Sequence, residues 1–175
     1  MFRIHRTSPL RIASILCFSL SCGVTLAQSA DKDPVAILEI GAATSWNIQG
    51  GAAAFAPDFA VEVTPIENWL ELEAGTTPYF TSTATEWDTD LLFKKPWTLS
   101  QKAEFMFGIG PEWVHKRQNG SSTNSVALEF AGDFMFWPTR KHRFGWYLEP
   151  AYDYNLARGH EQSIGISAGL LIAIP

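Results

Sequence analysis

Apolar residues alternate with small or polar residues, with a period of two, in eight successive segments of this sequence. In segment 103–114, for example, Phe105 and Phe107 alternate with Glu104 and Gly108. A period of two is typical of a β-strand whose two faces differ, and the 3.6-residue period of an amphipathic helix is not sustained anywhere in the sequence. The sequence therefore predicts an all-β meander. Its segments are 36–48, 54–63, 70–80, 87–94, 103–114, 126–136, 144–155 and 163–174.

Strands that follow one another through short turns can pair in sequence order and then close into a ring. Closure removes the unpaired strand edges that would otherwise invite aggregation. We therefore predict an eight-stranded antiparallel up-and-down β-barrel. Each segment has the roughly ten residues that a tilted strand needs to cross a bilayer. After the first 30 residues no run of 18 uncharged apolar residues occurs, which excludes membrane-spanning helices, and a net charge of -5 argues against nucleic-acid binding.

The first residues have the order of a secretory signal peptide. Arg3, Arg6 and Arg11 precede an apolar stretch that ends in small residues. We predict that residues 1–27 are a signal peptide, cleaved after Ala27. Without its three arginines the mature chain keeps 10 basic and 18 acidic side chains, a net charge of -8.

The mature chain then consists of one domain, the barrel, over residues 28–175. Cleavage after Ala30 is the alternative. Cys17 and Cys22 both lie in the segment that is removed, so the mature chain can form neither disulfides nor thiolate metal sites. Lipidation of Cys22 is disfavoured, because Ser19 stands where a lipoprotein signal has leucine.

Side-chain volume indicates which face of the barrel points inward. The interior of an eight-stranded barrel is only wide enough for side chains to fill it. Glycine and alanine alternate with acids on the polar face, whereas the apolar face carries most of the phenylalanine, tryptophan and isoleucine. We therefore predict that the apolar face points outward toward lipid. The larger residues expected in the lumen are Tyr79, Leu92, Met106, Met135, Tyr147 and Leu171. The alternative is a soluble periplasmic lipocalin-like barrel, with its apolar face inward around a hydrophobic ligand.

All seven tryptophans fall near strand ends. Membrane barrels place aromatic side chains in two belts at the membrane interfaces. If the chain starts on the periplasmic side, the outer belt is Trp46, Trp87, Trp113, Tyr152 and Tyr154. The inner belt is Trp69, Trp97, Trp137 and Trp146. The alternative is that the tryptophans are core residues of a β-sandwich.

Thirteen acidic residues share the inward face, with Lys94 as the clear basic partner. They are Glu39, Asp58, Glu62, Glu71, Glu73, Asp88, Asp90, Glu104, Glu112, Glu129, Asp133, Glu149 and Asp153. So many carboxylates in a narrow space need water or cations to remain ionised. This pattern indicates either a path or binding site for small cations, or a hydrated plug whose acids are partly protonated or hydrogen-bonded. No spacing matches a calcium-binding loop, and we expect no cofactor.

A signal peptide, a cysteine-free mature chain, eight alternating segments and two aromatic belts resemble the small outer-membrane β-barrels of Gram-negative bacteria. Segments 108–113 and 149–152 are similar to uncharacterised members. The resemblance implies an outer-membrane location and a monomer that contacts outer-membrane lipid, lipopolysaccharide and the barrel-assembly machinery. Such barrels usually end in an aromatic residue, whereas this sequence ends in Ile174 and Pro175, which puts the route of insertion in doubt.

Some barrels of this architecture are enzymes, and those that resemble lipid A deacylases keep a histidine, a serine and an acid at the outer rim. The nearest candidates here are His160, Glu161 and Ser163. The spacing differs from that family, and residues 160 and 163 have opposite parity, which directs them to different faces of a strand. We therefore expect a non-enzymatic protein with a structural role in the envelope.

The predicted outer loops are all short, which argues against a large receptor or adhesin surface. These loops are 47–51, 81–86, 115–123 and 155–158.

Overall fold

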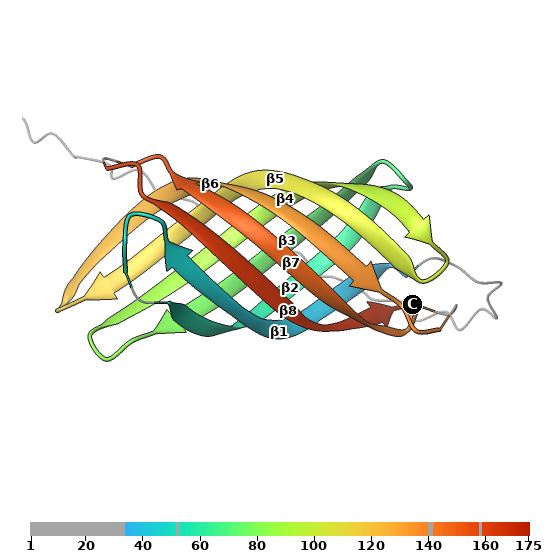
Figure 1. The fold of residues 1–175 in the computed structure, drawn as a ribbon, viewed down its shortest axis with the longest axis horizontal. Coiled ribbons are helices and arrows are strands. Elements are labelled where there is room, and N and C mark those ends of the chain that lie inside the picture. Colours follow the sequence, from blue (N-terminus) through green and yellow to red (C-terminus); the bar gives the residue numbers. More distant parts are fainter. Residues whose placement is uncertain (1–33, 52, 140–141, 158) are drawn as a thin grey trace, which may run out of the picture. The chain divides into compact units, whose positions relative to one another are not determined.

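The computed structural model describes residues 34–51, 53–139, 142–157 and 159–175, and these residues form one closed barrel (Figure 1). The predicted all-β, eight-stranded antiparallel barrel is confirmed. The predicted signal peptide lies outside the described residues. The strands are β1 (Ala36–Asn47), β2 (Ala54–Ile66), β3 (Leu70–Phe80), β4 (Ala84–Ser100), β5 (Ala103–Gln118), β6 (Ser121–Phe136), β7 (Phe144–Asn155) and β8 (Gln162–Ile174).

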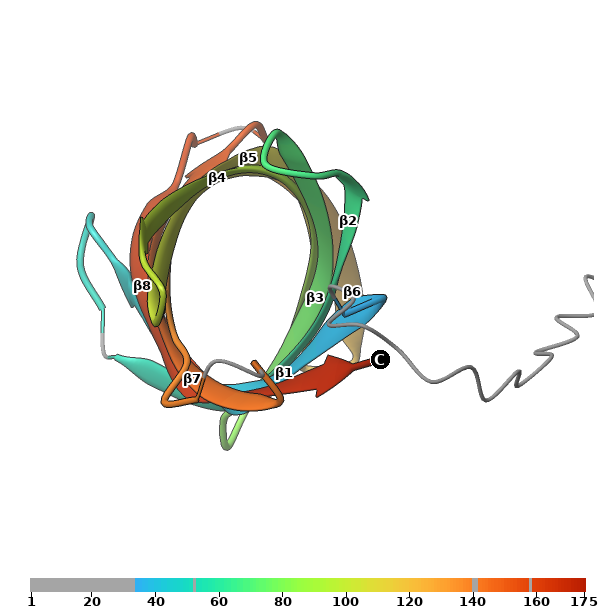
Figure 2. The same ribbon diagram turned by 90° about the vertical axis from the view of Figure 1, so that its right-hand side faces the viewer.

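Each strand pairs with its neighbours in sequence, and β1 also pairs with β8. The β1–β8 register runs from Ala36 opposite Ile174 to Asn47 opposite Ser163. The view along the barrel shows the resulting ring of tilted strands (Figure 2). Among the described residues there is no helix long and apolar enough to span a bilayer.

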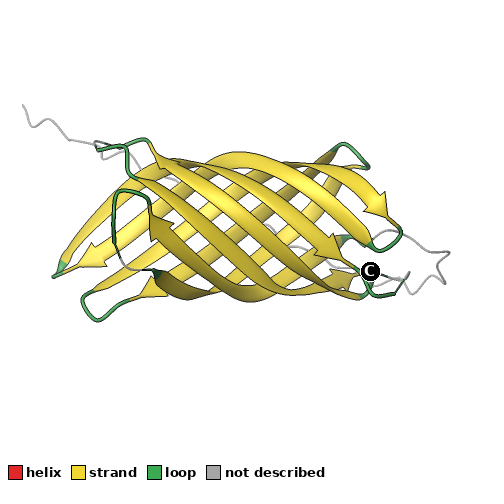
Figure 3. Cartoon of the chain, viewed as in Figure 1, coloured by secondary structure: helices red, strands yellow, loops and turns green. Residues whose placement is uncertain are grey.

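The connections between strands lie at two ends of the barrel and are short (Figure 3). We call the end with the β1–β2, β3–β4, β5–β6 and β7–β8 connections the outer end. The inner end carries the β2–β3, β4–β5 and β6–β7 connections, the start of β1 and the end of β8. The names follow the prediction that the chain starts on the periplasmic side.

The β5–β6 hairpin is longer than the sequence predicted. Residues 115–123, expected as a polar loop, are mostly strand, and the turn is reduced to Asn119 and Gly120. Both turn residues have positive φ, 51° and 80°, as a two-residue hairpin turn requires. The loop prediction is wrong because a polar sequence can continue a hairpin wherever the turn residues fix its register.

In each strand, alternate residues point to the inside and the outside of the barrel as the sequence predicted. The apolar face points outward: Phe93 and Ile109 are neighbours on β4 and β5, and they are 47% and 41% exposed. The larger residues predicted in the lumen are all buried, and they include Leu92 and Met106 on the same two strands. Large apolar side chains therefore cover the outside of the barrel, which is the reverse of a lipocalin-like arrangement.

Six of the seven tryptophans point outward. They are Trp46, Trp69, Trp87, Trp97, Trp113 and Trp146, and all six are exposed. Tyr152 and Tyr154 are half-buried on β7; the Tyr152 hydroxyl donates a hydrogen bond to Gln162, and the Tyr154 ring stacks on His160.

Trp137 differs from the other tryptophans, because its side chain lies inside the barrel. It is only 2% exposed, and its ring stacks on His142 at the inner end. The predicted position of Trp137 in the inner belt is wrong, because Trp137 has the inward parity of Asp133 and Met135. Gly145 leaves it space, since a Cβ there would lie 2.8 Å from the indole ring.

Candidate functional site

The lumen contains a cavity of about 860 Å³ that extends to the outer end of the barrel. Lys116, Gln118 and Glu161 line it near the β5–β6 and β7–β8 connections. Nine of the thirteen predicted lumen acids line its wall. They are Glu39, Asp58, Glu73, Asp88, Asp90, Glu112, Glu129, Glu149 and Asp153.

The other four predicted acids do not line this cavity. Glu62, Glu71 and Asp133 are buried within the barrel. Glu104 is half-buried near the inner end of β5. Glu86 also lines the cavity, at its mouth. We did not predict this residue in the lumen, although it alternates in step with Asp88 and Asp90.

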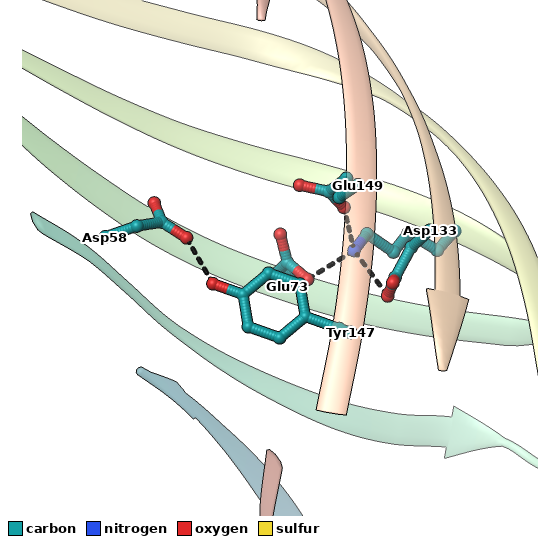
Figure 4. Close-up of polar contacts among 6 residues, drawn as sticks. Asp58, Glu73, Asp133, Tyr147 and Glu149 are labelled. Atoms are coloured by element: carbon teal, nitrogen blue, oxygen red, sulfur yellow. Dashed lines mark hydrogen bonds and ion pairs between the residues drawn. The ribbon is translucent and has the colours of Figure 1, made fainter. Parts of the chain in front are cut away.

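Lys94 on β4 is completely buried and is surrounded by carboxylates (Figure 4). Its Nζ donates hydrogen bonds to Glu73, to Asp133 at 3.3 Å and to Glu149 at 2.6 Å. These acids come from β3, β6 and β7, so one ammonium group joins strands on opposite sides of the ring. The stem of Lys94 fits because residue 108 is glycine; a Cβ there would lie 2.8 Å from the Lys94 Cγ. We call this set of four residues the Lys94 network.

Asp58 forms a second polar contact across the lumen (Figure 4). The Tyr147 hydroxyl donates to Asp58 Oδ2 at 2.6 Å, and the Thr77 hydroxyl donates to Asp58 Oδ1 at 2.7 Å. Tyr147 lies on β7, far from β2 in the sheet. Gly41 on β1 leaves the space for its hydroxyl group, because a Cβ at residue 41 would lie 2.5 Å from that oxygen.

Apolar side chains fill the lumen toward the inner end. Met106, Met135, Trp137, Tyr147 and Leu171 form one buried cluster, and each is at most 2% exposed. With the Lys94 network, this cluster forms a floor beneath the cavity. The cavity is therefore a cup that extends to the outer end, and its floor is closed by packed side chains.

Several buried carboxylate oxygens in the floor are not paired. Glu39 Oε1 and Asp133 Oδ1 have no hydrogen-bond partner among the described residues, and Glu62 has no nitrogen or hydroxyl donor there but interacts with another acid, Glu71. One carboxylate oxygen from each of Glu39, Glu62, Glu73 and Asp133 lies within 4.8 Å of the others. These four oxygens are a candidate metal-binding set.

At the mouth of the cavity, Lys116 pairs with Glu86, with 2.7 Å between Nζ and Oε2. The neighbouring His115 has the opposite parity, and its Nδ1 lies 2.6 Å from Asn124 Oδ1. The side chain of Lys116 therefore faces the cup, and we did not predict this residue in the lumen.

The three candidate catalytic residues are not arranged as a catalytic triad. The Ser163 hydroxyl donates to Asp153 Oδ2 at 3.0 Å and lines the cavity, as Glu161 does. His160 instead stacks on Tyr154, with 5.5 Å between ring centroids. The histidine ring is therefore engaged with a residue of outward parity, while the serine hydroxyl is bound to an inward acid.

No protein-family model matches this sequence, and no curated protein matches it. Solved structures do match the fold. Neisserial surface protein A is 15% identical, with a TM-score of 0.62 over 79% of this chain and 96% of its own. The attachment invasion locus protein Ail of Yersinia pestis is 12% identical, with a TM-score of 0.54 over 81% of this chain and 99% of its own.

The outer membrane enzyme PagL also matches, at 11% identity and a TM-score of 0.51 over 78% of this chain and 99% of its own. At these identities the comparisons concern the fold. A barrel of this kind therefore carries an enzyme in at least one protein. This chain therefore has the closed eight-stranded barrel fold of these solved structures.

Proposed function

We propose that this protein is an integral outer-membrane barrel with a structural role in the envelope, and that its lumen is a closed-floored acidic cup that holds cations without conducting them. The lipid-facing surface supports the membrane location, because so much exposed apolar side chain would aggregate in water. The short connections leave little surface for a large partner. Outer-membrane lipid and lipopolysaccharide are then the neighbours of the barrel wall.

The single observation that carries the proposal of a closed cup is the floor of the cavity. An ion that enters from the outer end meets the Lys94 network, whose ammonium group occupies the middle of the lumen. Beneath it lies the buried cluster that includes Met106 and Leu171, whose side chains have almost no exposed surface. Conduction needs a continuous hydrated path with sites that release the ion again. The closed floor therefore supports cation binding in the lumen and not cation transport through it.

The charge of the cup supports cation uptake. Its wall carries nine predicted lumen acids together with Glu86 and Glu161, whereas Lys116 at the mouth is already paired with Glu86. A recess lined by charges of one sign, with low-dielectric walls, concentrates counterions. We therefore expect the cup to be filled with water and cations.

A non-enzymatic role is part of the proposal. The match to PagL leaves catalysis open for the fold, but a nucleophile must be within hydrogen-bond reach of its base. In this chain the Ser163 hydroxyl is held by Asp153, and His160 stacks on Tyr154.

Cell fractionation tests the location. We expect the protein in the outer-membrane fraction, and we expect its folded form to migrate faster than its boiled form on a denaturing gel. Recovery of the protein in soluble form from a periplasmic extract would contradict the membrane proposal.

Planar-bilayer recordings test the closed floor. We expect no steady current from the purified barrel, while a general porin prepared in the same detergent serves as the positive control. A reproducible cation-selective current from the native protein would show that the floor opens, and conduction would then replace binding as the function of the lumen.

A further inference from the structure

Four buried carboxylates from different strands meet in the floor of the cup. Glu39 lies on β1, Glu62 on β2, Glu73 on β3 and Asp133 on β6. Glu62 and Glu73 are directly opposite each other across the β2–β3 pair, an arrangement that is unfavourable for like charges. One carboxylate oxygen of each residue lies within 4.8 Å of the other three.

Lys94 forms hydrogen bonds with two of these four acids. It donates to Glu73 Oε2 and Asp133 Oδ2, and its third bond goes to Glu149 outside the cluster. Asp133 Oδ1 and Glu39 Oε1 remain buried without a partner among the described residues. Glu62 is only 1% exposed, and in the same part of the chain no nitrogen donor or hydroxyl group reaches its oxygens, which instead interact with another acid, Glu71. Buried carboxylates without partners are costly in their ionised form, and a bound cation would offset that cost.

We propose that Glu39, Glu62, Glu73 and Asp133 bind one calcium ion in the floor of the cup. The ligands are all carboxylate oxygens, which hard divalent cations prefer. Calcium binds oxygen at roughly 2.3–2.6 Å, so two ligands on opposite sides of the ion lie about 4.6–5.2 Å apart. The four oxygens all lie within 4.8 Å of one another, so one ion of this size can contact all of them. Magnesium keeps several of its water ligands and is seldom enclosed by protein ligands alone, so four buried carboxylates favour calcium.

The ion can reach this site from the cup. Glu39 and Glu73 belong both to the cluster and to the wall of the cavity, whereas Glu62 and Asp133 lie deeper. The two outer ligands can therefore take up the ion from water before the two inner ligands complete its coordination. This inference rests on the proposed function only in requiring a lumen that is accessible from the outer end.

Equilibrium dialysis with radioactive calcium tests the proposal on the full mature barrel, refolded in detergent micelles and first stripped with a chelator. We expect one calcium ion per native chain. Glu62→Gln should weaken calcium binding by roughly tenfold or more, since even outer-shell changes at metal sites cost about 10–100-fold. Glu67→Gln is the matched control, because it removes the same charge from the exposed β2–β3 turn.

Thermal unfolding supplies a second measurement on the same samples. Calcium should raise the unfolding temperature of the native barrel and of Glu67→Gln, because a ligand that binds only the folded state stabilises it. At the same calcium concentration the rise should be clearly smaller for Glu62→Gln. In chelator, Glu62→Gln should be at least as stable as the native barrel, because it removes the repulsion with Glu73.

Two results would overturn the site: a native barrel that retains no calcium, or a Glu62→Gln barrel that retains as much as the native one. The gel shift on boiling shows whether each variant has folded. If Glu62→Gln does not fold, Glu39→Gln takes its place, with the same expectations for calcium binding. Fractionation and bilayer recordings measure membrane location and conduction and not calcium binding, so a barrel that fails the calcium test can still satisfy the proposed location and the closed floor.

Discussion

Lys94 of β4 and Glu149 of β7 meet across the lumen, with 2.6 Å between Nζ and Oε2. Their strands are not neighbours in the sheet, so this ion pair links opposite walls of the barrel in addition to the backbone ladder. Glu73 and Asp133 complete the link from two further strands. The barrel is therefore held together through its interior as well as around its circumference.

Lys94→Met should destabilise the barrel strongly. It leaves three acids without their shared cation, and breaking a buried ion pair in this way costs about 3–5 kcal/mol. Guanidinium unfolding from phospholipid vesicles measures the effect. Lys116→Met is the control: its pair with Glu86 lies at the solvated mouth, and loss of such a pair costs about 0–1 kcal/mol. Equal unfolding midpoints for the two variants would contradict the role of the Lys94 network.

A charge on the outer surface should cost most at mid-membrane depth. Ile109 lies between Phe93 and Phe130 on the neighbouring strands and points outward. Ile109→Arg should destabilise the membrane-inserted barrel by about 2–4 kcal/mol, whereas Phe80→Arg, at the outer end of β3, should cost about 0–1 kcal/mol. The same vesicle unfolding assay compares them. A cost that did not depend on depth would argue against lipid on this face.

The stability of the barrel should depend on the space that Gly41 leaves beside Tyr147. In Gly41→Ala the added Cβ would lie 2.5 Å from the Tyr147 hydroxyl oxygen and would also clash with the carbonyl of Ala168. Such overpacking costs about 1–3 kcal/mol in unfolding free energy. Gly165→Ala is the control, because its Cβ would approach the Thr44 carbonyl only to 3.5 Å. If both variants unfold at the same denaturant concentration, the lumen is packed more loosely than these distances imply.

The effect of a substitution in the β5–β6 turn should come from backbone conformation alone, without side-chain contacts. Gly120 has a φ of 80°, and a Cβ at this residue would have no atom of the described residues within 4 Å. Gly120→Ala should therefore lose about 1–2 kcal/mol through backbone strain. Gly132→Ala, in β6 with ordinary contacts to Phe105, should be neutral or slightly stabilising. Unfolding midpoints that rank the two variants in the opposite order would contradict the turn geometry.

Parity was the part of the fold that the sequence predicted best. Strict alternation determines whether a side chain points inward or outward, and the small residues on one face identify that face as the lumen. Trp137 shows the same rule, because its parity with Met135 already indicates an inward position. The belt assignment failed at this residue because it used nearness to a strand end in place of parity.

The sequence did not predict which side chains from different strands lie at the same level along the barrel axis. Lys94 could be identified as the basic residue of the lumen, but which acids meet it depends on the stagger between strands that are far apart in the sequence. Glu149 reaches Lys94 only after the registers of several strand pairs are fixed. The short β5–β6 turn was signalled by Asn119-Gly120, the dipeptide most typical of two-residue hairpins, which the polar residues around it obscured.

The pairing of β1 with β8 has a consequence for how the chain reaches its native state. Ala36 finds its partner, Ile174, only after nearly all of the described sequence has been synthesised and ordered. Contacts between residues so distant in sequence slow folding, because chain entropy is lost before they form. Until β1 and β8 pair and close this seam, their two strand edges remain free to pair with other chains. The seam between β1 and β8 is therefore the step at which folding and aggregation compete, and its completion commits the barrel to its final state.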